Sequence, residues 1–221
     1  MRVVIAGGHG QIALKLEALL AARGDSVAGL IRNPEHAADL RAAGAEPVEL
    51  DLESATVEQV AACLAGADAV VFAAGAGGKK SADGSDRKQN VDLGAAALLA
   101  EAAERAGVRR YLMISSYGAD TDPQGDYPAS FADYLRAKGQ ADEDLRGRDL
   151  DWTVLRPVTL TNEEPTGLVT LAAKVEPTQV SRADVAAVLL ALLDTPATAG
   201  LTVELTAGDT PVQEAVATIA G

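Results

Sequence analysis

Short apolar runs alternate with longer Ala- and Leu-rich stretches through residues 1–157 of this chain. Each run is continuously apolar, as is typical of a strand buried on both faces of a sheet. Strands separated by helices indicate a parallel sheet, because a parallel neighbour is reached through a crossover that is usually helical. The sequence therefore predicts an α/β fold: a doubly wound, Rossmann-like parallel sheet with helices on both faces. The predicted strands are RVVIA (2–6), SVAGLI (26–31), AEPVEL (45–50), DAVVFAA (68–74), RRYLMIS (109–115) and DWTVLRP (151–157), and the predicted helices cover 11–23, 34–43, 55–64, 86–106 and 130–147.

The pattern changes after Pro157. A Thr-, Pro- and Glu-rich stretch predicts a loop over 159–167, and Ser181 followed by Asp184 is typical of the start of a helix. No linker is long enough to separate two domains, so we predict one domain over 1–221, with 157–180 as a small insertion on the substrate side. The remaining predicted elements are strands near 168–171 and 177–180, a helix over 181–193, and a last strand, GLTVELT, over 200–206.

Composition excludes several classes of partner. The net charge of −13 opposes binding to nucleic acid or to anionic membranes, because both present phosphate charge. The longest basic clusters, Lys79-Lys80 and Arg109-Arg110, are expected to be solvated surface. No apolar run approaches the roughly 20 residues that a membrane-spanning helix needs. We therefore expect no nucleic-acid and no membrane partner, while the oligomeric state stays open.

The single cysteine and the N-terminus bear on location. Cys63 has no second cysteine with which to form an intrachain disulfide, and its apolar surroundings indicate a buried helix position rather than a reactive thiol. The apolar run over 3–6 is too short for a signal peptide. Together these features predict a cytoplasmic protein, and no metal site is expected.

Three glycines, Gly7, Gly8 and Gly10, lie between the first predicted strand and the first predicted helix. In this context the spacing Gly7-x-x-Gly10-x-x-Ala13 is typical of a dinucleotide-binding loop. Gly7 permits a tight turn, Gly10 lets the backbone approach a pyrophosphate, and Ala13 is small enough for the helix to pack on its strand. The alternative interpretation is a tight turn that holds no ligand.

The helix that follows the glycines would face such a phosphate with its N-terminus. Free backbone N–H groups and the positive end of the helix dipole favour an anion there. Gln11 and Ile12 are therefore candidate cofactor residues beside the glycines, and His9 is expected to contribute its backbone rather than to act as a catalyst.

The end of the second predicted strand selects between the two nicotinamide dinucleotides. An acidic residue there would bind a ribose 2′-hydroxyl, whereas an arginine accommodates a 2′-phosphate. This strand ends in Arg32-Asn33-Pro34 without an acid, which favours NADP(H) over NAD(H), unless Arg32 is a solvated loop charge. After the third strand, Asp51-Leu52 would lie beside an adenine, or else Asp51 is the N-cap of the next helix.

Tyr134 and Lys138 are the candidate catalytic pair. They are four residues apart on a predicted helix and therefore share one face. A nearby cation favours the ionised form of a phenol, which brings its pKa of about 10 toward the working range of an acid or base. Ser115 and Ser116, at the end of the fifth strand, are candidates for orienting a substrate carbonyl. The alternative is that the serines only end a strand and the tyrosine only packs.

These motifs together resemble the short-chain dehydrogenase/reductase superfamily. Within it, the chain is similar to the atypical, small NAD(P)H-binding branch that includes biliverdin/flavin reductase-like and nitrogen-repressor-like proteins. The interval from Ser115 to Tyr134 is longer than is usual in the best-known branch. The matching segments are GGHGQIA (7–13), IRNP (31–34), DL (51–52), FAAGAG (72–77), VDLGA (91–95), AGVRRYLMISSYGAD (106–120), YLRAKGQADEDL (134–145), LDWTVLRP (150–157) and VSRADVA (180–186).

The resemblance implies roles for further residues. Ser115, Tyr134 and Lys138 would take the superfamily's Ser-Tyr-Lys places, with Lys138 also anchoring the nicotinamide ribose. Tyr117 is expected to be a pocket residue only. The residues that would pass beneath the cofactor or flank its nicotinamide are Ala73, Ala74, Gly75, Pro157 and Val158.

Three functions follow from these candidates. The first is an NADP(H)-dependent oxidoreductase that acts on a small carbonyl, alcohol or quinone-like substrate, with Tyr134 as acid/base. The second is a redox sensor that binds NAD(P)(H) without turnover and acts through a protein partner. The third is a sugar-nucleotide epimerase or dehydratase, which uses the same Tyr and Lys but generally carries a larger C-terminal substrate domain.

Overall fold

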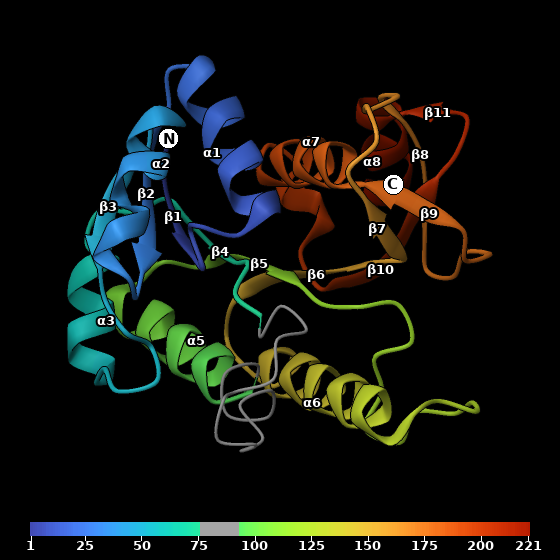
Figure 1. Ribbon diagram of the computed structural model, residues 1–221, viewed down its shortest axis with the longest axis horizontal. Coiled ribbons are helices and arrows are strands. Elements are labelled where there is room, and N and C mark those ends of the chain that lie inside the picture. Colours follow the sequence, from blue (N-terminus) through green and yellow to red (C-terminus); the bar gives the residue numbers. More distant parts are fainter. Residues whose placement is uncertain (76–92) are drawn as a thin grey trace.

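A single nine-stranded sheet runs through the computed structural model, which describes residues 1–75 and 93–221 (Figure 1). The strands of this sheet are β1 (Arg2–Ala6), β2 (Ser26–Ile31), β3 (Glu46–Glu49), β4 (Ala69–Phe72), β5 (Arg110–Ile114), β6 (Asp151–Pro157), β8 (Leu168–Ala172), β10 (Leu201–Ala207) and β11 (Thr210–Pro211). A separate two-stranded sheet pairs β7 (Thr159–Thr161) with β9 (Gln179–Ser181). The helices are α1 (Gln11–Ala22), α2 (Ala37–Ala42), α3 (Val57–Cys63), α5 (Ala95–Ala106), α6 (Ala129–Arg146), α7 (Arg182–Leu193) and α8 (Val212–Ala220), with 3-10 turns η1 (Pro34–His36) and η3 (Pro196–Thr198).

The strand order is β11-β8-β10-β6-β5-β4-β1-β2-β3. Neighbours from β3 through β10 pair in parallel, whereas β8 pairs antiparallel with both β10 and β11. The chain turns from β1 toward β2 and β3 on one side, and from β4 toward β5 and β6 on the other. The carboxyl ends of β1 and β4 therefore meet where the strand order reverses, which is where open α/β sheets form a ligand crevice. The predicted doubly wound fold is confirmed.

Two helical layers bury the two faces of this sheet (Figure 1). Residues of α1, α2, α7 and α8 pack on one face, together with Val3 and Ile5 of β1. Residues of α3, α5 and α6 pack on the other, together with Val4 and Ala6. Because successive residues of β1 point to opposite faces and both faces are covered, the strand has to be apolar at every position, as its sequence is.

Two helix ends are capped, and the cap at Ser181 is the one expected from the sequence. Gly107 ends α5 in the left-handed conformation, with φ of +72°. The Ser181 hydroxyl accepts a hydrogen bond of 3.0 Å from the Asp184 N–H and caps α7. The predicted helix over 86–106 is confirmed over 95–106, and its first residues, 86–92, lie outside the described residues, as do Lys79-Lys80 and parts of the 72–77 and 91–95 motifs.

Two predictions about the C-terminal third are wrong. The segment 159–167 begins with a strand, β7, because it pairs with β9 some twenty residues later, a non-local contact that local composition does not reveal. The strand at 201–207 is followed by β11 and by helix α8, whose Val and Thr content lowers its intrinsic helix propensity. Burial of Val212 and Val216 against the core stabilises α8 in spite of this.

Arg110 corrects a third expectation. Arg109 is half exposed and pairs with Asp149 and Asp151, as solvated surface charge does. Arg110 is instead partly buried, and its guanidinium donates to the Thr153 and Thr198 hydroxyls and to backbone carbonyls. Its role in the described structure is to tie β5 to β6 and to the end of α7.

Cys63 ends α3 and is partly rather than fully buried. Burial raises the pKa of its thiol, which makes the thiolate scarcer at neutral pH, in line with the expected unreactive position. No helix in the described parts of the chain is both long and apolar enough to cross a membrane.

Candidate functional site

The loop between β1 and α1 can be built only from glycine at its first position. Gly7 has φ of +80°, and a Cβ there would lie 2.6 Å from the Cα of Ala74. The Gly10 N–H donates to the Gly7 carbonyl at 2.8 Å, which closes the turn. The loop therefore packs directly on the segment that follows β4, and the predicted tight turn is confirmed.

The N-terminus of α1 has no side-chain cap among the described residues. Gly10 is the N-cap and supplies no side chain, and no acidic residue lies in the first turn. The N–H groups of the first turn have no partner within the helix and carry the positive end of its dipole. A backbone cradle of this kind, open to close approach at Gly10, fits a phosphate group.

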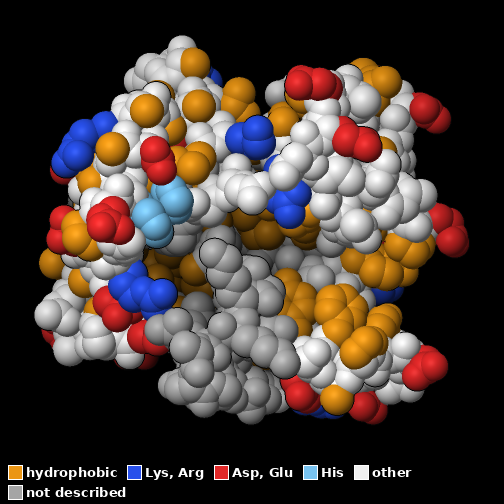
Figure 2. All heavy atoms as spheres, in the orientation of Figure 1, with side chains coloured by type: hydrophobic (Ala, Val, Ile, Leu, Met, Phe, Trp, Pro, Cys, Tyr) orange, Lys and Arg blue, Asp and Glu red, His pale blue; other side chains and the backbone are white. Residues whose placement is uncertain are grey.

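A cavity of 480 Å³ lies over this cradle at the carboxyl ends of the parallel strands. This volume lies within the range of about 300–1,000 Å³ that small-molecule sites usually have. Figure 2 shows hydrophobic side chains on both sides of the hollow in this face, with most acidic side chains away from it. The predicted residues that line the cavity are Gly10, Gln11, Ile12, Ala73, Ala74, Gly75, Ser115, Ser116, Tyr134, Lys138, Pro157 and Val158.

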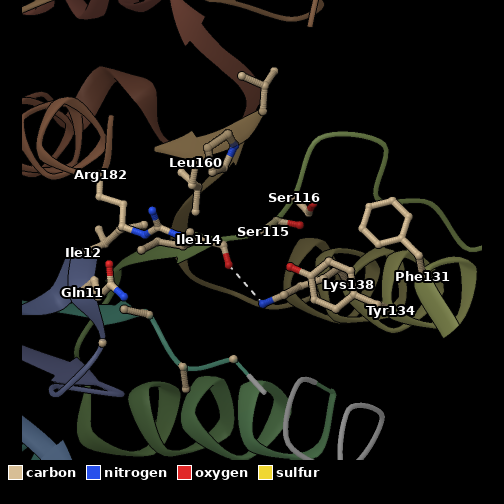
Figure 3. Close-up of a pocket in the computed structure, with 16 residues that line it drawn as sticks. Gln11, Ile12, Ile114, Ser115, Ser116, Phe131, Tyr134, Lys138, Leu160 and Arg182 are labelled. Atoms are coloured by element: carbon tan, nitrogen blue, oxygen red, sulfur yellow. Dashed lines mark hydrogen bonds between the residues drawn. The ribbon is translucent and has the colours of Figure 1, made fainter. Parts of the chain in front are cut away.

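Tyr134 and Lys138 lie one turn apart on α6, with their polar ends toward the cavity (Figure 3). Lys138 is only 4% exposed. Its Nζ donates to the Ile114 carbonyl at 3.3 Å and lies 5.6 Å from the centre of the Phe72 ring. A cation held in such a low-dielectric position acts on its neighbours more strongly than a solvated one would.

Gly139 explains how the long interval between the serines and Tyr134 still brings them together. A Cβ at Gly139 would lie 2.2 Å from the carbonyl carbon of Asp120. The loop that follows β5 therefore packs directly on α6, and the Asp120 N–H donates to the Leu135 carbonyl at 3.3 Å. The extra residues of the interval lie between this contact and the start of α6 at Ala129.

Ser115 and Ser116 are in different hydrogen-bonding states. The Ser115 hydroxyl donates to Asp142 Oδ2 at 3.0 Å, and the same oxygen accepts two bonds from Arg156, at 2.9 and 2.8 Å. Burial raises the pKa of Asp142, and the Arg156 guanidinium opposes that rise. Because a hydroxyl has a single proton, Ser115 can only accept toward the cavity, whereas Ser116 makes one local bond of 3.2 Å to the Tyr117 carbonyl.

Tyr117 does not line the cavity, which corrects the expectation that it is a pocket residue. Its backbone N–H donates to the Pro157 carbonyl at 2.9 Å, and its ring packs against the core on the α1 and α7 side of the sheet. The chain direction after β5 turns this ring inward, which the sequence alone did not indicate.

The candidate residues for the adenosine end lie apart from this cavity. Arg32 pairs with Glu53 at 2.7 Å, and its side chain is 52% exposed. Asp51 accepts a hydrogen bond from the Glu53 N–H, and the N-cap of α3 is Thr56, with a complete capping box. The interpretation of Asp51 as an N-cap is therefore wrong, and Leu52 packs beside the α3 and α5 core.

His9 faces away from the cavity. Its Nε2 lies 2.7 Å from a carboxylate oxygen of Asp39, and its ring stacks on His36 with the ring centres 3.6 Å apart. His9 therefore presents only its backbone toward the N-terminus of α1, as expected for a residue that is not a catalyst. Gly8 packs toward Gly29 and also lies outside the cavity lining.

Sequence reasoning missed several residues of the cavity wall. Phe131 stacks with Tyr134 at 5.9 Å between ring centres and also contacts Tyr127, so α6 supplies an aromatic edge. Leu160 of β7 and Arg182 of α7 complete the wall. The segment PASFADYLRAK carried a signal for Phe131, three residues before Tyr134, whereas no local signal places Leu160 beside Arg182.

The fold and the glycine cradle define a dinucleotide-binding protein. A family described as NAD(P)H-binding matches residues 7–196, and the chain belongs to this family. It is 39% identical over 217 residues to the uncharacterized sugar epimerase YhfK of Bacillus subtilis (strain 168), covering 98% of this chain and 99% of that protein.

Two solved structures are similar over almost their whole length. A candidate NAD-dependent epimerase/dehydratase from Bacillus halodurans is 37% identical, with a TM-score of 0.88 and 99% of both chains covered. The oxidoreductase ylbE from Lactococcus lactis is 28% identical, with a TM-score of 0.85, covering 99% of this chain and 96% of that one. The resemblance to the atypical short-chain branch is thereby confirmed for family and fold.

Proposed function

We propose that this protein is an NADP(H)-dependent oxidoreductase of the atypical short-chain type. It transfers a hydride between C4 of the nicotinamide and a small carbonyl, alcohol or quinone-like group. The observation that carries the proposal is that the glycine cradle, the paired serines, Tyr134 and Lys138 reach a single cavity. A protein that only bound the dinucleotide would not need a phenol and a buried ammonium beside it.

The residues of the cradle fit a dinucleotide. Gly7 and Gly10 leave the backbone bare, and the uncapped first turn of α1 presents the N–H groups of Gln11 and Ile12 to a pyrophosphate. The segment from Ala73 to Gly75 would pass beneath the ribose, and Pro157-Val158 would flank the nicotinamide. When bound, the cofactor supplies the hydride or accepts it.

Tyr134 is assigned as the acid/base. Reduction of a carbonyl needs a proton at the oxygen, and the Tyr134 phenol lines the cavity from α6. Lys138, buried one helical turn away on the same helix, is the proposed partner of this phenol. Lys138 is also the proposed anchor of the nicotinamide ribose.

The two serines are assigned different roles. Ser116 is the proposed donor to the substrate carbonyl, because its only hydrogen bond within residues 1–75 and 93–221 is a local one that substrate can replace. The proton of Ser115 is held by Asp142, so Ser115 accepts from the substrate or from Tyr134 and fixes the wall of the cavity. Loss of the Ser116 hydroxyl should therefore lower kcat/KM more than loss of the Ser115 hydroxyl.

A preference for NADP(H) is proposed from Arg32. It lies immediately after β2, where the ribose 2′-position of a dinucleotide is read, and it is exposed enough to reorient toward a 2′-phosphate. Glu53 competes for the same guanidinium, so the preference is expected to be moderate. Asp51-Leu52 would lie at the adenine.

An epimerase or dehydratase is the second candidate, favoured by the names of two of the relatives. These reactions would use the same Tyr134 and Lys138 but would hold a tightly bound cofactor through a full catalytic cycle. Residues 157–180, proposed as the substrate-side insertion, supply only β7, β8 and β9. This leaves little protein to enclose a nucleotide sugar.

The test is oxidation of NADPH in the presence of a panel of small carbonyls and quinones. Tyr134→Phe should lower kcat by about 100-fold or more, the usual contribution of a general acid, with NADPH affinity retained. Tyr117→Phe is the matched control, because this tyrosine packs outside the cavity. Full activity in Tyr134→Phe would refute the acid/base role, and net-neutral isomerisation of a sugar nucleotide would favour the epimerase.

A further inference from the structure

We propose that Arg182 binds an anionic group of the substrate, a carboxylate or a phosphate, at the side of the cavity opposite Tyr134. This inference rests on the proposed function and names the class of substrate that it takes. Figure 3 shows Arg182 and Tyr134 on opposite sides of the cavity, with Ile114 and Leu160 between them.

The small sheet of β7 and β9 places Arg182. The two strands run in parallel and end on the pair Thr161 and Ser181, so Asn162 and Arg182 follow at equivalent positions. Arg182 Nη1 donates to Asn162 Oδ1 at 3.0 Å. This bond fixes the direction of the guanidinium and uses one of its five N–H groups, which leaves the others available to a ligand.

The backbone beneath Arg182 is fixed by Asp184. This carboxylate is buried and accepts hydrogen bonds from the N–H groups of Thr166 and Gly167 and from the Ser181 hydroxyl. The connection from β7 to β8 is thereby held to the first turn of α7. Arg182 therefore extends from a rigid support into the cavity, as a preorganised binding group requires.

The charges of the described cavity lining favour an anion. Across residues 1–75 and 93–221, Arg182 forms no ion pair, and the described lining includes Lys138 and Arg182 but no carboxylate. This absence contrasts with a chain that has 32 acidic and 19 basic residues. A partly buried guanidinium next to a neutral amide gains most from a ligand that brings a negative charge.

The remaining wall describes the rest of the substrate. Phe131 and Tyr134 form an aromatic edge on one side, and Ile114, Val158 and Leu160 supply apolar surface. A carbonyl at Tyr134 and an anion at Arg182 would be joined by an apolar or aromatic body. The substrate class is therefore an apolar carbonyl compound that bears a carboxylate or a phosphate remote from the carbonyl.

The same guanidinium chemistry would also suit the pyrophosphate of the cofactor, because Gln11 and Ile12 lie on the Arg182 side (Figure 3). Two titrations separate these sources. Calorimetry with NADP⁺ alone measures the affinity for the cofactor. Calorimetry of the NADP⁺ complex with 4-formylbenzoate and with its methyl ester measures the effect of substrate charge at a constant shape.

Arg182→Gln should weaken the binding of 4-formylbenzoate by about tenfold or more, which corresponds to the loss of one charged hydrogen bond. The affinities for the methyl ester and for NADP⁺ should stay within about twofold of wild type. Arg182→Lys should recover part of the affinity, since the charge is kept. Arg136→Gln, which removes a guanidinium paired with Asp133 on the same protein, should change none of the three. Unfolding midpoints identify any variant that fails to fold.

Two results would overturn the inference. The first is an Arg182→Gln protein that binds NADP⁺ more weakly but discriminates acid from ester as wild type does, which would assign Arg182 to the cofactor. The second is a wild type that binds acid and ester equally. Neither binding measurement requires turnover. Absence of NADPH oxidation would therefore overturn the proposed function, while the calorimetry would still test the role of Arg182.

Discussion

The two sides of the cavity are built from different materials. On the α1 side the groups that face a ligand belong to the backbone: bare glycines and the N–H groups of an uncapped helix. On the α6 and α7 side they are side chains, Tyr134, Lys138 and Arg182. Lys138 is held by the Ile114 carbonyl and Arg182 by the Asn162 side chain. A backbone site can serve any ligand with a pyrophosphate, whereas the side-chain site defines which substrate is used.

A different backbone contact holds each side of the cavity in place. The glycine loop is fixed by a close approach of two backbone segments, at Gly7 and Ala74. The α6 side is fixed by another such approach, at Gly139 and Asp120. Changing one glycine at a time should therefore impair cofactor binding and substrate turnover separately.

The largest effect is expected for Gly7→Ala. The new Cβ would require a left-handed backbone, at about 1–2 kcal/mol, and would overlap Ala74, at about 1–3 kcal/mol. NADPH affinity should fall by about tenfold or more, measured by fluorescence titration. Gly66→Ala is the control, since Gly66 also has positive φ but no atom of the described residues within 4 Å of an added Cβ. Equal behaviour of the two variants would show that the contact with Ala74 is unimportant.

Gly139→Ala should affect the opposite side. The added Cβ meets the Asp120 backbone and should displace the loop that carries Ser115 and Ser116 from α6, at a cost of about 1–3 kcal/mol. We expect kcat/KM to fall by about tenfold or more, with NADPH affinity within about twofold of wild type. Gly147→Ala, which meets only ordinary contacts, should retain both. A parallel loss of NADPH binding in Gly139→Ala would contradict the separation of the two sides.

Glu17 provides a pH test of the cofactor side. Its carboxyl is fully buried against Gly8 and Gly29, without a hydrogen-bond partner among the described residues, and burial raises its pKa to about 8. The folded state therefore binds more protons than the unfolded state between the ordinary pKa of 4.5 and about 8. This contribution to stability is complete below pH 4.5 and is lost as pH rises through 8.

Urea denaturation at several pH values measures this effect. The slope due to Glu17 should approach about 1.4 kcal/mol per pH unit within that window. Glu17→Gln should flatten the profile and raise the unfolding free energy at pH 8, whereas Glu214→Gln on the exposed face of α8 should leave it unchanged. An unaltered profile in Glu17→Gln would mean that the carboxyl is solvated in the native protein.

The smallest effect is expected at the exposed pair of Arg32 and Glu53. Exposed ion pairs are worth about 1 kcal/mol or less. Glu53→Gln should therefore strengthen NADPH binding by up to about fivefold without changing NADH, because it frees the guanidinium for a 2′-phosphate. Arg32→Ala should lower the affinity for NADPH to that for NADH. Equal wild-type affinities for the two cofactors would remove the proposed preference for NADP(H).

The contrast between the two sides explains what could be predicted from the sequence. The parallel sheet and the glycine loop follow from patterns within a few residues, such as Gly7-x-x-Gly10 between a strand and a helix. Tyr134 and Lys138 are also local, being four residues apart on one helix. The pairing of β7 with β9, which places Arg182 beside Asn162, joins segments about twenty residues apart and leaves no local pattern.

The serines show a second limit of local patterns. Their sequence does not distinguish Ser115 from Ser116, because the difference is made by Asp142, which lies on α6 and is itself paired with Arg156 of β6. The Ser115 hydroxyl has its hydrogen-bond acceptor only when β5, α6 and β6 have packed together. Hydrogen-bond direction at a site of this kind becomes available only with the structure.

Transfer of deuterium tests the central claim most directly. NADPH deuterated at C4 is incubated with the protein and 4-formylbenzoate, together with the wider carbonyl panel, and the products are examined by mass spectrometry. Quinones are followed by NADPH oxidation instead, because deuterium delivered to a quinone oxygen exchanges with water. With the wild-type protein, we expect deuterium on the former carbonyl carbon of the product. Tyr134→Phe should form labelled product at least about 100-fold more slowly at equal NADPH occupancy. Tight NADPH binding without label in any product would contradict the account and favour a sensor that holds the cofactor without reacting.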